Sequence, residues 1–141
     1  MSADTLYAKW TMKDIDGNPF ELNMLSTNSD KILLLFWSAG CSHCVEMVNN
    51  LYSWQKQSTF QSEFMVVAIS LDETEMETGA WEKKIVELKG WKHLHAAEGV
   101  RSKVASNYFV LATPVLFLLD AKTKQIVAAP SSLNELLAVI E

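Results

Sequence analysis

Two cysteines stand three residues apart in Cys41-Ser42-His43-Cys44, and they are the only cysteines of the 141-residue chain. They follow a short break, Ser38-Ala-Gly40, between an apolar run and a helical pattern. Cysteines at this spacing at a helix start can approach closely enough to form a disulfide. The free amides and the dipole of a helix N-terminus favour negative charge. The spacing therefore predicts that Cys41 is the attacking thiolate and that Cys44, one turn deeper and more buried, is the resolving thiol.

His43 lies between the two cysteines. An imidazole beside Cys41, and still more an imidazolium, would stabilise the thiolate. A stabilised thiolate favours the reduced pair, so the disulfide becomes a stronger oxidant. The alternative interpretation is a polar helix residue without redox effect, and we favour the redox role.

A metal site is the competing chemistry for these residues. Cys41, His43 and Cys44 can be grouped with His93 and His95, which would share one strand face. Structural zinc normally needs four ligands, and the chain has no second Cys-x-x-Cys. We therefore predict no metal site, although a soft thiolate pair could bind Cu(I).

Three continuous apolar runs are typical of strands buried on both faces, at residues 32–37, 64–71 and 115–119. The first two are joined through a helix and are expected to be parallel, by a right-handed crossover. Residues 125–129 return from the third run as a hairpin. Weaker patterns indicate strands at Lys9–Asp16, Phe20–Leu22 and Leu94, and a turn at Asp16–Pro19.

Apolar residues at helical spacing predict helices over residues 41–57 and 75–88, and a short helix is expected over residues 99–108. Ser132 and Glu135 form a capping box that starts a final helix to about Ile140. The charged stretches Glu73–Glu77 and Lys83–Lys84 are interpreted as solvated helix surface. This order of elements predicts an α/β sandwich with a central mixed sheet and helices on both faces.

Composition limits the function classes. The chain is 49% hydrophobic and 21% charged, with a net charge of −5, which fits one globular domain over residues 1–141. Residues 1–8 are expected to be flexible or a cloning remnant. The negative net charge argues against a nucleic-acid partner, because binding to phosphates requires clustered Lys and Arg side chains. The apolar run Ile32 to Ala39 is too short to span a bilayer, and no signal peptide is visible.

Three segments resemble thioredoxin-like proteins. Leu33-Leu-Leu-Phe-Trp37-Ser-Ala-Gly-Cys41-Ser-His-Cys44 is similar to their active-site segment. Ala112-Thr113-Pro114-Val115-Leu-Phe-Leu-Leu-Asp120 is similar to their cis-proline loop with its following strand. Val66-Val-Ala-Ile-Ser-Leu-Asp72, with a helical insertion after it, resembles the TlpA/ResA-type branch. The resemblance implies a thioredoxin-like three-layer sandwich with an N-terminal extension and a central helical insertion.

The resemblance also implies a thiol–disulfide oxidoreductase. Its cofactor would be its own disulfide, Cys41–Cys44, and its partners would be proteins with thiols or disulfides and a redox-recycling protein. Family members of this type are bacterial and periplasmic or membrane-tethered, and we expect a monomer. By position, Thr113 and Pro114 would line the substrate groove. The same resemblance assigns Gly40 and Ser42 to the groove and Trp37 to packing beside the disulfide.

The chain departs from the thioredoxin pattern next to the cysteines. Thioredoxins carry Trp directly before the first cysteine, where Gly40 stands here. Their buried acid, the Glu of TlpA-like proteins and the helix-kinking proline are replaced by Leu35, Met47 and Asn49, respectively. The sequence therefore offers no obvious carboxylate to take the proton of Cys44.

His43 replaces the usual proline before the second cysteine, as in strongly oxidising disulfide donors. Two alternatives to an oxidoreductase stay open on the same fold. One is a Cu(I) metallochaperone that uses Cys41 and Cys44, and the other is a non-catalytic redox-sensing interaction domain.

Overall fold

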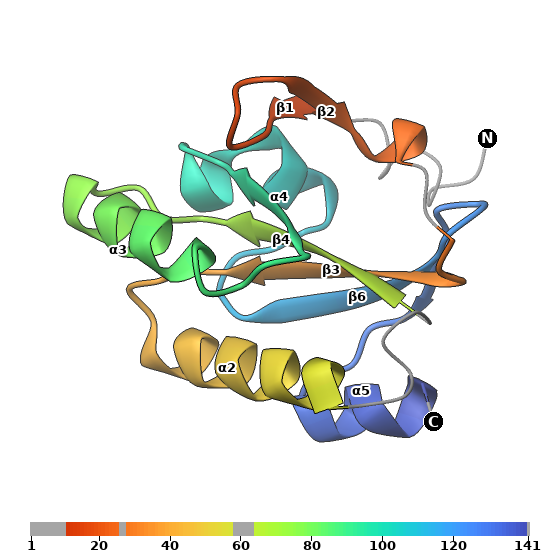
Figure 1. Ribbon diagram of the computed structural model, residues 1–141. Helices are drawn as coiled ribbons and strands as arrows, with labels where there is room; N and C mark the ends of the chain where they lie inside the picture. The colour runs from red at the N-terminus through yellow and green to blue at the C-terminus, as the bar shows by residue number, and fades with distance from the viewer. Residues whose placement is uncertain (1–10, 26–27, 58–63, 141) are drawn as a thin grey trace.

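The computed structural model describes residues 11–25, 28–57 and 64–140. A five-stranded sheet forms the centre, in the order β5-β4-β3-β6-β7 (Figure 1). Strands β3 (Lys31–Trp37), β4 (Phe64–Ser70) and β5 (Lys92–His95) are parallel to one another. Strands β6 (Val115–Asp120) and β7 (Ile126–Ala128) add antiparallel pairs beyond β3. The sheet is therefore mixed, as expected.

The apolar run of β3 serves both faces of the sheet. Leu33, Leu35 and Trp37 belong to one buried cluster, and the alternate residues Ile32, Leu34 and Phe36 belong to the other. All six side chains are fully buried. A strand covered on both sides can be apolar at every position, which explains the continuous run.

Helices cover both faces (Figure 1). Helix α2 (Ser42–Gln57) and helix α5 (Leu133–Ile140) lie against the face that carries Trp37. Helix α4 (Lys103–Asn107) lies on the opposite face, and helix α3 (Glu75–Ile85) follows the carboxyl end of β4. Strands β3 and β4, which α2 connects, pair in parallel, as predicted.

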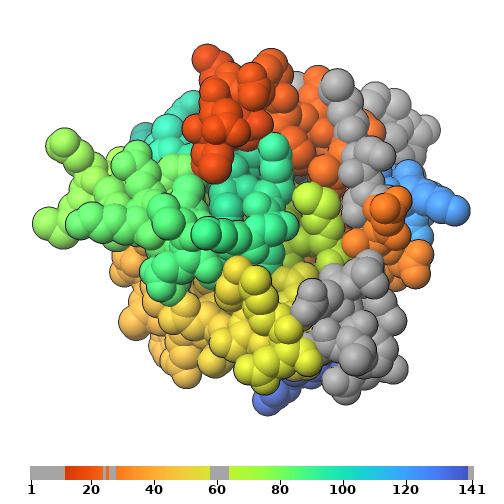
Figure 2. All heavy atoms as spheres, in the orientation of Figure 1, coloured from red at the N-terminus to blue at the C-terminus, as the bar shows by residue number. Residues whose placement is uncertain are grey.

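A small hairpin of β1 (Thr11–Lys13) and β2 (Pro19–Glu21) precedes the sheet, followed by the 3-10 turn η1 (Leu22–Met24). Figure 2 shows this hairpin, in red, resting on the green-cyan part of the surface. Lys92 of β5 pairs there with Asp14 at 3.1 Å. Strand β1 is shorter than the predicted Lys9–Asp16, of which residues 9 and 10 lie outside the described residues, and β2 begins one residue earlier than the predicted Phe20–Leu22.

Two of the predicted helices have other bounds in the structure. Helix α3 ends at Ile85 rather than Leu88, and the expected helix over residues 99–108 is divided into η2 (Gly99–Arg101) and α4. Ser102 interrupts it because its hydroxyl accepts a hydrogen bond from the amide of Ala105 and so starts a new helix. Glu135 caps the amide of Ser131 rather than that of Ser132, while Ser132 accepts from Glu135 as predicted.

Within the described part of the chain, no helix is both long and apolar enough to cross a bilayer.

Candidate active site

The Cys-x-x-Cys segment lies where β3 passes into α2. The amide of Cys41 donates to the carbonyl of Ser38 at 3.1 Å, which closes a tight turn. The carbonyl of Cys41 then accepts the amide of Val45 at 3.0 Å, so Cys41 stands at the cap of α2. The nucleophile predicted from spacing is thus placed at a helix N-terminus, where free amides favour a thiolate.

The two cysteines have different surroundings. Cys41 is half-buried and Cys44 is fully buried, and both side chains are thiols. The amide of Cys44 donates to Cys41 Sγ at 3.3 Å. Cys41 is therefore the more exposed cysteine and Cys44 the more buried one, as the sequence predicts.

The pKa values of the two thiols move in opposite directions. Burial alone would raise the pKa of Cys41, but hydrogen bonds from the thiol and amide of Cys44, the Thr113 hydroxyl and the His43 amide lower it overall. Burial, and then the hydrogen bond to Cys41, raises the pKa of Cys44 to about 11. Cys41 is the thiol that ionises first, and Cys44 keeps its proton.

The Thr113–Pro114 segment faces the two sulfurs. Phe36 of β3 pairs with Val115 of β6, so the residues just before β6 lie beside the end of β3. The Thr113 hydroxyl forms hydrogen bonds with both cysteines, and the peptide bond before Pro114 is cis. Segments 70 residues apart in the chain thereby meet at one site, as the resemblance implies.

The remaining predicted residues surround this pair. Trp37 is fully buried in the same cluster as Cys44. Gly40, Ser42 and His43 are exposed on the segment that carries the cysteines. The contribution of His43 to the Cys41 thiolate comes from its backbone amide. A redox effect of its imidazole stays a prediction.

The structure does not assemble the five-residue metal set. His93 Nε2 donates to the carbonyl of Leu88 at 2.8 Å, and burial lowers the pKa of this imidazole. His95 Nε2 donates to the carbonyl of Asp72 at 2.7 Å, and its ring stacks on Trp81 with centroids 4.9 Å apart. Among the described residues, no three or more His, Cys, Asp or Glu side chains are grouped to hold a metal.

A buried carboxylate holds the loop before Cys41, and sequence reasoning missed it. Asp72 is fully buried just beyond the end of β4. Its oxygens accept from the Ser38 hydroxyl at 2.5 Å and from the amides of Ala39 at 3.0 Å and Gly40 at 3.4 Å. The Ser70 hydroxyl donates a fourth hydrogen bond at 2.5 Å.

The signal for Asp72 was its position. It lies two residues beyond the end of a buried strand that is parallel to β3, and the carboxyl ends of parallel strands meet at one edge of a sheet. The carboxylate that the active-site segment lacks is therefore supplied by a neighbouring strand. It contacts the loop that precedes Cys41.

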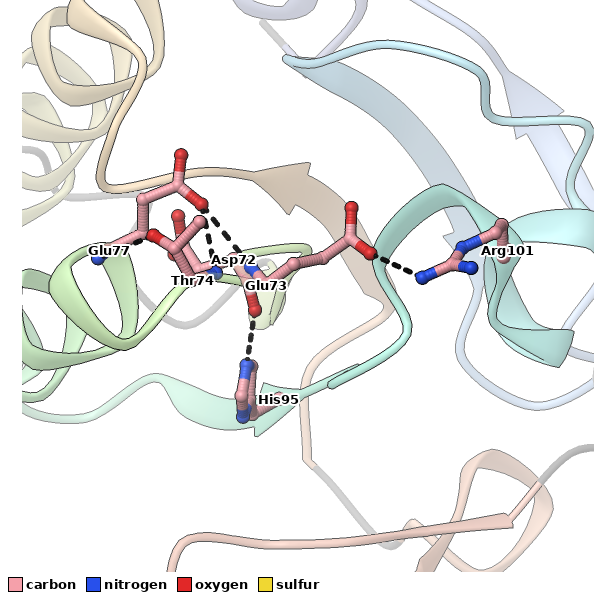
Figure 3. A network of polar contacts seen from close by, with 6 residues as sticks. All are labelled: Asp72, Glu73, Thr74, Glu77, His95 and Arg101. Carbon is pink, nitrogen blue, oxygen red and sulfur yellow. Dashed lines mark hydrogen bonds and ion pairs between the residues drawn. The ribbon is translucent and has the colours of Figure 1, made fainter.

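Residues 73–76 are exposed, as the sequence predicts, whereas Glu77 is half-buried and has specific contacts. Figure 3 shows Glu77 folded back over the start of α3, and Glu73 turned toward Arg101. Thr74 Oγ1 accepts the amide of Glu77 at 3.1 Å, while Glu77 Oε1 accepts the amides of Glu73 and Thr74 at 3.3 Å each. The other oxygen of Glu77 lies against Gly40: a Cβ added there would stand 2.7 Å from it. A side chain at residue 40 would therefore require Glu77 to shift.

Residues 28–126 match the family model described as thioredoxin-like. The match spans more than half of the chain, and together with the sheet and the cysteine pair it places the chain in the thioredoxin-like family. No curated protein matches the chain significantly in sequence.

Solved structures give the same fold. A thiol:disulfide interchange protein from Bacteroides sp. is 28% identical with a TM-score of 0.70, over 93% of this chain and 82% of that one. The thioredoxin domain of a thiol-disulfide oxidoreductase from Bacteroides vulgatus is 25% identical with a TM-score of 0.72, over 93% and 89%. A thiol-disulfide oxidoreductase from Bacteroides fragilis is 23% identical with a TM-score of 0.75, over 93% of each chain. These similarities are consistent with the TlpA-type branch.

Proposed function

We propose that the protein is a thiol–disulfide oxidoreductase that acts on protein thiols and disulfides through Cys41 and Cys44. The observation that carries this proposal is the contrast between the two thiols. The Cys41 pKa is lowered at a half-buried helix start, and the Cys44 pKa is raised to about 11 beneath it. Such a pair can attack with one sulfur while it protects the other.

The reaction balances as two exchanges. The Cys41 thiolate attacks one sulfur of a substrate disulfide, the substrate S–S bond breaks, and the other substrate sulfur leaves as a thiolate that takes a proton from solvent. Cys44 then gives up its proton and attacks Cys41 Sγ, which releases the second substrate thiolate. The substrate gains two electrons and the protein is left with a Cys41–Cys44 disulfide. The reverse sequence oxidises a substrate dithiol.

Thr113 and Pro114 are proposed to bind the substrate chain near its reactive sulfur. The Thr113 hydroxyl can donate to whichever sulfur carries negative charge, since it reaches both cysteines. Its backbone is offered for strand-like pairing with an extended substrate segment. Gly40 and Ser42 are exposed on either side of Cys41 and would flank that segment.

His43 is proposed to tune the redox potential. Its amide supports the Cys41 thiolate, and its imidazole is exposed on the segment that carries both cysteines. Stabilising the thiolate would shift the pair toward the oxidising end of the family's range.

We infer an extracytoplasmic site of action, periplasmic or membrane-tethered, because the similar structures are bacterial thiol–disulfide oxidoreductases. A disulfide that turns over in this way needs a recycling protein, and the pair itself serves as the redox cofactor. We also propose that the protein is a monomer and that it does not bind nucleic acid.

Insulin-disulfide reduction with dithiothreitol tests the function. We expect the wild-type protein to accelerate it, and Cys41→Ser to abolish the acceleration. Cys44→Ser should form mixed disulfides that persist on non-reducing gels, because nothing resolves them. Full activity of Cys41→Ser would end the proposal.

A further inference from the structure

A carboxylate of α3 lies beside the attacking cysteine. Glu77 Oε2 is 2.7 Å, and its Cγ 3.0 Å, from the point where a Cβ of Gly40 would stand. Because one C–C bond adds about 1.5 Å, this oxygen lies within roughly 4 Å of the Gly40 α-carbon. Gly40 is exposed and directly precedes Cys41. A substrate segment that reaches Cys41 past Gly40 therefore meets Glu77.

The position of this carboxylate is fixed. Its other oxygen accepts the amides of Glu73 and Thr74, and the Thr74 hydroxyl accepts the amide of Glu77 in return (Figure 3). This reciprocal capping box holds the side chain over the first turn of α3. Glu77 is therefore a constant feature of the rim, and it is half-buried rather than extended into solvent.

The acids next to Glu77 have partners of their own. Glu73 is paired with Arg101 at 3.0 Å, and Asp72 is buried under four hydrogen bonds. No ion pair among the described residues involves Glu77. His43 is the other titratable group on this exposed segment. At neutral pH the rim beside Cys41 thus carries a negative charge that a substrate can neutralise.

We propose that Glu77 is a specificity-determining residue that favours substrates with Lys or Arg next to the reactive cysteine. The inference rests on the proposed oxidoreductase function, since it concerns which thiols and disulfides reach Cys41. For charges about 6 Å apart in a water-like dielectric, attraction changes the encounter by about threefold per unit charge. A cationic and an anionic substrate then differ by about tenfold.

Three small disulfides of similar size test the proposal: cystamine, bis(2-hydroxyethyl) disulfide and 3,3′-dithiodipropionate. Each half of the molecule carries one positive charge, no charge or one negative charge, respectively, at neutral pH, so one unit charge accompanies the sulfur that is attacked. Each would oxidise the reduced protein to the Cys41–Cys44 disulfide and be reduced to two thiols. The measurement is the rate constant for each probe, taken at low and at high salt.

The informative variant is Glu77→Gln, because glutamine keeps the capping box and removes the charge. Glu82→Gln is the matched control. It removes the same charge from an exposed position of α3 that is five residues farther along, on another face of the helix.

We expect the cystamine-to-dithiodipropionate rate ratio to fall about tenfold in Glu77→Gln and to stay unchanged in Glu82→Gln. The wild-type ratio should also fall at high salt, because ions screen exposed charges. An equal ratio in wild type and Glu77→Gln would overturn this inference while leaving the oxidoreductase intact. Failure of all three probes to oxidise the wild type would instead overturn the proposed function, and this inference with it.

Discussion

Replacing Asp72 by alanine should cost more stability than any comparable change at an exposed acid. The side chain is fully buried and accepts four hydrogen bonds. Its loss leaves the fully buried Ser70 hydroxyl without the acceptor of its hydrogen bond, at a cost of about 1–3 kcal/mol. Ala39 is only half-buried and Gly40 is exposed, so their amides can recover water and add less.

Relief of a buried charge offsets part of this loss. We therefore expect Asp72→Ala to lower the free energy of unfolding by about 2–4 kcal/mol. Urea unfolding of the reduced protein, followed by tryptophan fluorescence, measures it. With a slope near 1.5 kcal/mol/M, the midpoint should fall by roughly 1–3 M.

Asp120→Ala is the matched control for this experiment. Asp120 accepts the amides of Lys122 and Thr123 at 2.9 Å each, in an exposed turn far along the chain from the cysteines. Its loss should cost less than about 1 kcal/mol. Asp72→Asn keeps the shape of the side chain and serves as a second variant in case Asp72→Ala does not fold. In Asp72→Asn, the amides of Ala39 and Gly40 should exchange hydrogen faster than in the wild type. If Asp72→Ala costs no more than Asp120→Ala, the carboxylate does not hold this loop.

Two further predictions follow from the titrating groups. Iodoacetamide at pH 8 should label Cys41 and leave Cys44 unlabelled, because a thiol with a pKa of about 11 is ionised to about one part in a thousand at that pH. Peptide mass spectrometry identifies the labelled cysteines, and equal labelling of both would contradict the assignment. Burial lowers the pKa of His93 below its ordinary 6.5, so its contribution to stability is complete above pH 6.5 and is lost as the pH falls. His93→Gln should therefore reduce the stability difference between pH 7 and pH 5 in urea titrations, and an unchanged difference would refute this account.

The parts of the fold that sequence predicts well are those written in local patterns. The run of β3 alternates between two cores and is apolar throughout, and the Cys-x-x-Cys spacing alone indicates which sulfur is exposed. The division of residues 99–108 depends on a single capping hydroxyl at Ser102. Such an interruption changes the periodicity too little to be recognised in advance.

The residues that surround Cys41 could not be predicted from local patterns because their contacts are distant in the chain. Asp72 meets Ser38 across 34 residues, and its sequence context is only a strand end. Glu77 has the pattern of an exposed helix position, and only the missing side chain of Gly40 reveals what it touches.

The groups that stabilise the Cys41 thiolate are separate from the two carboxylates near it. The groups that lower its pKa are the thiol and amide of Cys44, the Thr113 hydroxyl and the His43 amide, all of which are neutral donors. Hydrogen bonds from neutral donors are insensitive to salt, whereas an exposed charge such as Glu77 is screened. The intrinsic reactivity of Cys41 and its choice between charged substrates therefore have separate physical origins. Ionic strength should alter the choice and leave the reactivity with a neutral disulfide nearly constant.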